Sequence, residues 1–404
     1  MNNMKISSVW IWIAVVLFTC AGCATARHPV PLALSEKAQI ADMDEIRLVM
    51  GEHHTRLQKN LLLSLRQEKP GDYPVERDGT KVYPVLAISG GGTNGAYGAG
   101  FLKGWSREGS RPVFKIVTGV STGAIIAPFA FLGKEYDHDL ELCYTTMSTK
   151  DVMANKLPFM ILFGDSLSSN APLAKTIDRV VNKDIIKKIA VEHNRGRRLF
   201  VGTANLDTER FVIWDMGAIA VRGDEDLFQK VILAFAAIPM IFPPSIFHVE
   251  ADGKVYDELH ADGGTLTQVF GIHSILQGMD MAGEELGIDP AKIRGRLYII
   301  RNGYMSPTYK RVQDNLSALA QRSFDMIIDS QSVGDAYRLY VFAKESDNEY
   351  NLAFIPADFV QHSNEMFDTE DMKRLFARGY EDAAKGYKWH KTPPGLESAV
   401  YPKK

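Results

Sequence analysis

Two neighbouring stretches, VYPVLAISGGGTNG at residues 82–95 and FKIVTGVSTGAIIAPFAFL at residues 114–132, decide the fold of this 404-residue chain. The first is an apolar run that ends in three glycines and leads into a helix-compatible segment at 96–108. The second is an apolar run that ends at Ser121 and leads into an apolar helix-compatible segment at 123–132. A strand, a tight loop and a helix form the first half of a βαβ unit. Two such units in succession predict parallel strands with helices packed on the sheet.

The rest of the chain extends this pattern in both directions. Residues 35 to about 67 place apolar side chains at helical spacing and predict a helical flank that ends at Pro70. After Tyr304 the pattern is mainly helical, with helices expected at 312–330 and 369–384 and one strand-like run at 352–356. An α/β layered sandwich is therefore the expected class. Its further strands are expected at 199–204, 211–215 and 297–301, and its further helices at 173–181, 226–237 and 273–285.

Composition excludes several classes of protein. With 46% hydrophobic and 24% charged residues, the chain has the make-up of an ordinary globular protein, which excludes fibrous and wholly disordered chains. The 46 basic and 49 acidic residues leave a net charge of −3, so no overall positive field favours a nucleic-acid partner. The three cysteines, Cys20, Cys23 and Cys143, are too few for a disulfide framework.

The N-terminus is typical of a targeting segment. Lys5 precedes an apolar run at 9–19, and small residues then lead to Cys23, which is the layout of a signal peptide. The segment also resembles a bacterial lipoprotein signal, in which the cysteine after the small residues is lipidated and becomes the new N-terminus. By this resemblance residues 1–22 are removed and Cys23 carries the lipid, with Cys20 as the other candidate. A plain secretory signal cut near Ala24 or Ala26 is the alternative.

Residues 119–123 fit the pattern G-x-S-x-G at the point where an apolar strand meets an apolar helix. A serine on such a tight turn takes a strained backbone conformation, so Gly119 and Gly123 must leave room around it. The helix behind Ser121 would direct its N–H groups and its positive dipole end towards a developing oxyanion. This context favours the interpretation of Ser121 as a catalytic nucleophile over the interpretation of residues 119–123 as a glycine-rich turn without function.

Residues 90–95, GGGTNG, permit two functional interpretations. Gly90, Gly92 and Gly95 match a dinucleotide fingerprint, but that motif requires an acidic residue at the end of the second strand, and Ser121 follows that strand instead. Alternatively, Gly90, Gly91 and Gly92 form a loop whose N–H groups bind an oxyanion. Because adjacent parallel strands lie about 4.8 Å apart, this loop and the serine turn would open into one crevice.

The sequence Asp-Gly-Gly at residues 262–264 is a common turn signal. Because a serine nucleophile needs a base, Asp262 is also a candidate for that base. A Ser-Asp-His triad would require a later histidine, and the candidates are His273, His362 and His390. His260 precedes Asp262 by two residues and would lie on the same face of a strand. We expect it to be a supporting or exposed histidine.

Together, the three segments resemble the patatin-like phospholipase family, whose members combine a glycine-rich loop, a G-x-S-x-G turn and an Asp-Gly-Gly or Asp-Gly-Ala motif in this order. The resemblance covers residues 82–303 and extends to AAIP at 236–239 and FPP at 242–244. Asn94 stands where many members have arginine or lysine, and it lacks their charge. The resemblance implies a Ser–Asp dyad without histidine. In this chain the nucleophile would be Ser121, the base Asp262, the oxyanion loop Gly90, Gly91 and Gly92, and the supporting glycines Gly95, Gly119, Gly123 and Gly263.

The resemblance implies a three-layer α/β/α fold with a mainly parallel sheet, and a serine lipid acyl hydrolase of the phospholipase A or esterase type. The expected organisation is a signal peptide at 1–22, a tether and helical flank at 23–81, a catalytic domain at 82–303 and a mainly helical region at 304–404. Expected partners are a lipid or acyl ester and the bacterial envelope, with outer-membrane attachment through Cys23 facing the periplasm. No metal, cofactor or nucleic acid is expected. A non-catalytic lipid-binding envelope protein, a Ser-His-Asp hydrolase and a dinucleotide-binding oxidoreductase remain as alternatives.

Overall fold

The computed structural model of the chain describes residues 27–43, 46–50, 55–155, 166–239, 241–271, 283–363, 365 and 367–396. Within these residues the main sheet has the strand order β1-β7-β6-β3-β2-β10-β11, with the hairpin β8–β9 attached to β6. Neighbours from β6 to β11 run parallel, whereas β1, β7 and β9 pair antiparallel. The strands are β1 (Arg47–Val49), β2 (Lys81–Ile88), β3 (Ile116–Gly119), β6 (Arg198–Asn205), β7 (Arg210–Asp215), β8 (Ser245–Ala251), β9 (Lys254–Asp262), β10 (Ile293–Arg301) and β11 (Glu349–Phe354).

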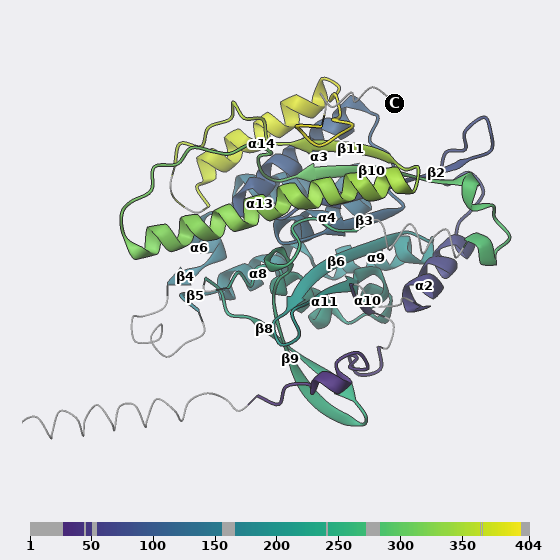
Figure 1. The fold of residues 1–404 in the computed structure, drawn as a ribbon, viewed down its shortest axis with the longest axis horizontal. Coiled ribbons are helices and arrows are strands. Elements are labelled where there is room, and N and C mark those ends of the chain that lie inside the picture. Colours follow the sequence, from purple (N-terminus) through teal and green to yellow (C-terminus); the bar gives the residue numbers. More distant parts are fainter. Residues whose placement is uncertain are drawn as a thin grey trace, which may run out of the picture.

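Two hydrophobic clusters cover the two faces of this sheet. Along β2, Leu86 and Ile88 belong to one cluster, whereas Val85 and Ala87 belong to the other, because successive strand side chains point to opposite faces. One face carries most of the helices, and the other carries α2 and the long α13, which lies across the sheet in Figure 1. This confirms the three-layer α/β/α class. The main helices are α2 (Thr55–Arg66), α3 (Gly95–Glu108), α4 (Thr122–Leu132), α5 (Asp137–Thr145), α8 (Ala171–Val180), α9 (Lys183–Asn194), α10 (Met216–Arg222), α11 (Glu225–Ala234), α13 (Leu316–Glu345) and α14 (Thr369–Ala384).

The region after residue 303 is built into the same sandwich. Strand β11 extends the edge of the sheet beside β10, and α14 packs against α3. Glycines permit this close helix contact, because a Cβ on Gly100 would lie 2.0 Å from the carbonyl oxygen of Phe376 and one on Gly379 would lie 2.2 Å from that of Tyr97. The helix predicted at 312–330 is longer than expected and forms α13.

The prediction of one helical flank from residue 35 to about 67 is wrong in its first part. Arg47–Val49 form β1 on the edge of the sheet, and among the described residues of this flank helix is present only at α2. Apolar spacing could not reveal this, because the strand is held by tertiary contacts such as the ion pair between Arg47 and the buried Glu258. Among the described residues, no helix is long and apolar enough to cross a membrane. The predicted signal at 1–22, Cys20 and Cys23 lie outside the described residues.

Candidate active site

Ser121 occupies a strained turn between β3 and α4. Its φ of 53° and ψ of −128° lie outside the regions that residues other than glycine ordinarily adopt. The glycines on either side are required by close backbone contacts. A Cβ on Gly119 would lie 2.4 Å from the carbonyl oxygen of Gly123, and one on Gly123 would lie 2.4 Å from that of Ile88. The turn leaves the serine half-buried at the N-terminus of α4.

Asp262, which is distant from Ser121 in the sequence, lies beside it in the fold. It ends β9, which pairs antiparallel with β6 so that Asp262 lies opposite Thr203. The hydroxyl of Ser121 donates a 2.7 Å hydrogen bond to Oδ2 of Asp262, and the N–H of Gly264 donates one of the same length to Oδ1. The close approach again requires glycine, because a Cβ on Gly263 would lie 2.3 Å from the carbonyl oxygen of Gly202.

Burial makes the Asp262 carboxylate a stronger base than an exposed aspartate. The residue is only 6% exposed, and the loss of solvation raises the pKa of its carboxyl group from 3.8 to about 6. The hydrogen bonds from Ser121 and Gly264 act in the opposite direction and keep the rise modest. At neutral pH the carboxylate is therefore largely ionised and able to accept the serine proton.

The glycine-rich loop follows β2 and lies against the serine turn. A Cβ on Gly90 would lie 3.1 Å from Cβ of Ser121. However, the N–H of Gly90 donates to the carbonyl oxygen of Gln268 at 2.9 Å, so the prediction that all three loop glycines offer N–H donors is wrong for Gly90. Gly91 and Gly92 have φ values of 149° and 56°, and within the described chain no acceptor is assigned to their N–H groups. These two groups are the donors available to an oxyanion.

Gly95 connects the glycine-rich loop to α3. A Cβ at this position would lie 2.3 Å from the hydroxyl of Thr122, the first residue of α4, and 2.8 Å from the ring of Tyr144. The predicted supporting role of Gly95 thus has a steric basis, because it allows the starts of α3 and α4 to approach each other. The side chain of Asn94 instead accepts a hydrogen bond from Gln361 at 2.9 Å.

Three buried polar residues that sequence analysis missed hold the two loops in place. Asn302, just after β10, donates from its amide to the carbonyl oxygen of Ser89 and accepts from the N–H of Gly98. Asp335 in α13 accepts from the N–H groups of Gln268 and Val269, while the Gln268 side chain donates to the carbonyl oxygen of Gly264. No motif marks Asn302 and Asp335, since their partners are backbone groups far away in the sequence.

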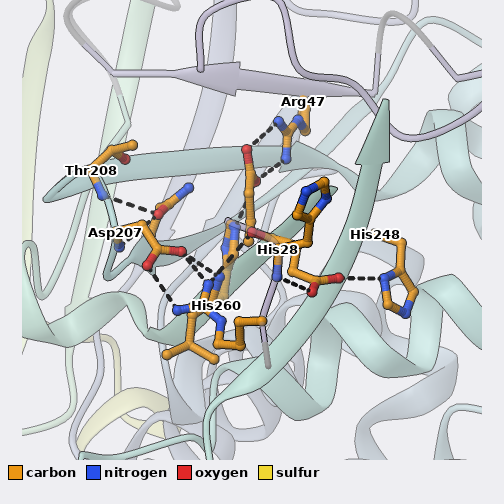
Figure 2. A network of polar contacts seen from close by, with 11 residues as sticks. His28, Arg47, Asp207, Thr208, His248 and His260 are labelled. Carbon is orange, nitrogen blue, oxygen red and sulfur yellow. Dashed lines mark hydrogen bonds and ion pairs between the residues drawn. The ribbon is translucent and has the colours of Figure 1, made fainter. Parts of the chain in front are cut away.

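His260 supports β9 and does not contact the dyad. Its ring is fully buried, with Nδ1 2.8 Å from the hydroxyl of Thr203 and Nε2 3.1 Å from Glu258. Glu258 in turn binds Arg47 through two hydrogen bonds, as Figure 2 shows. Burial lowers the pKa of His260, which favours a neutral ring. The expectation of a supporting histidine therefore agrees with its contacts.

The histidines considered for a triad do not meet the dyad in the described part of the chain. The backbone N–H of His362 donates to Asp371 near the start of α14, and His390 packs on Phe354 of β11. His273 lies outside the described residues. Within the residues that the structure places, the hydrogen-bond partners of the Asp262 carboxylate are Ser121 and Gly264.

Comparison with known proteins agrees with this geometry. Residues 86–273 match the family model described as patatin-like phospholipase, and this range includes the glycine-rich loop, Ser121 and Asp262. Residues 86–273 are therefore similar to patatin-like phospholipases. The match supports a lipid hydrolase and disfavours the dinucleotide interpretation of residues 90–95. The crystal structure of VipD from Legionella pneumophila is similar at a TM-score of 0.32 and 12% identity, over 78% of this chain and 69% of that one. No curated protein matches the chain.

The raised pKa of Asp262 predicts that ionisation of this carboxyl group lowers the stability of the folded protein above pH 6. The carboxyl group is protonated in both the folded and unfolded chain below pH 3.8, and stability is lost as pH rises through about 6. The loss amounts to about 3 kcal/mol of unfolding free energy. Asp262→Asn should therefore raise Tm relative to wild type more at pH 8 than at pH 4, measured by thermal denaturation. A Tm difference that is the same at both values would contradict this.

Proposed function

We propose that the chain is a serine lipid acyl hydrolase of the phospholipase A or esterase type, with Ser121 as nucleophile and Asp262 as base. The observation that carries the proposal is the 2.7 Å hydrogen bond from the Ser121 hydroxyl to a carboxylate whose pKa burial raises to about 6. A base near this pKa combines useful basicity with ionisation at neutral pH. The carboxylate can therefore accept the proton directly, without an intervening imidazole.

The proposed reaction has two acyl-transfer steps. Oγ of Ser121 attacks the ester carbonyl carbon as its proton passes to Oδ2 of Asp262, and the N–H groups of Gly91 and Gly92 bind the oxyanion. The tetrahedral intermediate then collapses, the C–O bond to the alcohol breaks, and the alcohol takes the proton from Asp262. Water, deprotonated by Asp262, hydrolyses the acyl-enzyme by the reverse sequence and regenerates Ser121.

The alternative is a lipid-binding protein that has lost catalysis. The strain at Ser121 and the buried charge at Asp262 both lower stability, and a binding protein would have no use for either. Ser121 and Asp262 form one hydrogen-bonded pair, and the nearby N–H groups of Gly91 and Gly92 have no acceptor among the described residues. This combination supports an enzyme.

Replacement of the nucleophile tests the proposal. The purified protein should release fatty acid from a panel of acyl esters and phospholipids, and Ser121→Ala should reduce the rate by at least about 10³-fold because the acyl acceptor is lost. Cys143→Ala is a matched control, since Cys143 is buried and burial raises the pKa of its thiol to about 12. The Ser121→Ala protein should keep the wild-type circular dichroism spectrum. Equal turnover by wild type and Ser121→Ala would reject Ser121 as nucleophile.

We further propose that lipidation of Cys23 anchors this enzyme to the bacterial envelope, at the outer membrane facing the periplasm. Ala24 follows the cysteine, in place of the aspartate that often retains lipoproteins at the inner membrane. The tether is short, because Arg27 already pairs with Asp207 at 2.5 Å and the N–H of His28 donates to Asp257 on β9. Figure 2 includes this docked segment. From residue 27 onwards, the chain therefore packs on the folded domain.

Subcellular fractionation tests the anchor. Cys23→Ser should release the mature protein into the soluble periplasmic fraction or block processing, because the acyl chains that supply about 0.8 kcal/mol per buried CH₂ are absent. Its specific activity on a soluble short-chain ester should stay within about twofold of wild type. Cys20→Ser is the control and should remain membrane-bound. If Cys23→Ser stays on the membrane and Cys20→Ser does not, the lipid is on Cys20.

A further inference from the structure

The first half of α13 has an exposed apolar side. Leu316, Leu319, Met326 and Ile327 are 85%, 48%, 57% and 65% exposed. At about 100° per residue these four positions fall on one side of the helix. The other positions on this side between 316 and 330 are Ala320, Ser323 and Ser330, which are exposed and uncharged. This side therefore forms an apolar stripe that carries no charge. The solvent-facing side of a helix ordinarily carries charged residues, so the stripe is unusual.

On the side that continues the stripe, the second half of the same helix carries the exposed charges of Arg338, Lys344 and Glu345 around Val341, which is 49% exposed. On its opposite side, Leu339 and Ala343 belong to the hydrophobic cluster on this face of the sheet, and the carbonyl oxygen of the buried Ala336 accepts a hydrogen bond from Tyr350 of β11. The Tyr337 hydroxyl donates to the carbonyl oxygen of Pro394 in the C-terminal tail. The charge-free part of the stripe's side is thus confined to residues 316–330, because charged residues interrupt it further along the helix.

The exposed half extends past the active-site edge of the sheet. Because α13 connects the parallel strands β10 and β11, it runs antiparallel to them and begins at their carboxyl ends. Asp329 pairs at 3.1 Å with Arg301, the last residue of β10, so the 13 residues before it project about 20 Å beyond the sheet. Figure 1 shows α13 running past the ends of β10 and β11. Ser121 and the glycine-rich loop lie at this same edge, at the carboxyl ends of β3 and β2.

The loop before α13 adds side chains suited to lipid headgroups. Tyr309 is 94% exposed and is followed by the exposed Lys310 and Arg311. The Arg322 side chain donates to the carbonyl oxygen of Thr308 at 2.9 Å, which holds this loop against the helix. An exposed tyrosine beside two cations is typical of segments that lie at a membrane interface.

We propose that residues 309–311 and the stripe formed by Leu316, Leu319, Met326 and Ile327 are a docking surface for a lipid bilayer. The four apolar side chains enter the acyl region, while Tyr309 and the cations contact headgroups. This surface rests on the proposed function, because it presents the Ser121 edge of the sheet to lipid. It acts independently of the Cys23 anchor, because the segment after that cysteine contacts Asp207, between β6 and β7, through Arg27 and Asp257 of β9 through His28.

Vesicle binding without catalysis tests the surface. The mature chain with Cys23→Ser and Ser121→Ala is sedimented with phosphatidylcholine and phosphatidylglycerol vesicles, which removes both the anchor and turnover from the measurement. Leu319→Asp with Ile327→Asp should weaken vesicle binding at least tenfold. Val113→Asp is the matched control, because Val113 is 63% exposed and precedes β3 at the opposite edge of the sheet. It should bind as the parent does. Unchanged binding by the stripe variant, or an equal loss in Val113→Asp, would overturn the proposal.

Activity measurements separate this proposal from the proposed function. With Ser121 intact, the stripe variant should hydrolyse a soluble short-chain ester within twofold of the parent rate but lose at least tenfold on vesicle phospholipid. If the parent binds vesicles through the stripe and hydrolyses no ester, the proposed function fails and the docking surface stands. If the stripe substitutions convert a dimer to a monomer in sedimentation velocity and leave vesicle binding intact, the surface belongs to a second copy of the chain.

Discussion

The hydrogen bond between Ser121 and Asp262 is the constraint on which the rest of the structure depends. It joins the end of β3 to the end of β9, across 141 positions of sequence, at a distance of 2.7 Å. Both ends of this bond need close backbone contacts: Gly119 and Gly123 permit the serine turn beside β2, and Gly263 lets the chain after Asp262 approach β6. The sheet order places β6 between the two strands, so β9 must pair with β6 for the dyad to form.

A buried carboxylate with a raised pKa needs a rigid surrounding, because a mobile one would admit water and restore its ordinary pKa. Asp335 and Gln268 fix the chain after Asp262, while Asn302 fixes the glycine-rich loop opposite. On the other side of β9, the chain of contacts from Arg47 through Glu258 to His260 holds the strand. The N-terminal flank thus stabilises the strand that carries the base, although it contributes no residue to the dyad.

The sequence was sufficient to predict the βαβ core, the serine turn and Asp262, because each depends on local spacing of apolar residues and glycines. It was insufficient for the role of Gly90, whose N–H is occupied by the distant carbonyl of Gln268. It also missed β1 and the β8–β9 hairpin, whose stability comes from pairing with remote strands. Asn302 and Asp335 could not be recognised, since an isolated polar residue gives no sign that its partner is a loop backbone 200 or 70 positions away.

The central claim is that Asp262 activates Ser121 without a histidine, and the rate of fluorophosphonate labelling at Ser121 tests it most directly. If Asp262 is the base, Asp262→Asn should slow labelling by about 10²-fold or more. His273→Ala, His362→Ala and His390→Ala should each label within a few-fold of wild type. A histidine variant that keeps its fold but labels as slowly as Asp262→Asn would contradict the account and establish a triad.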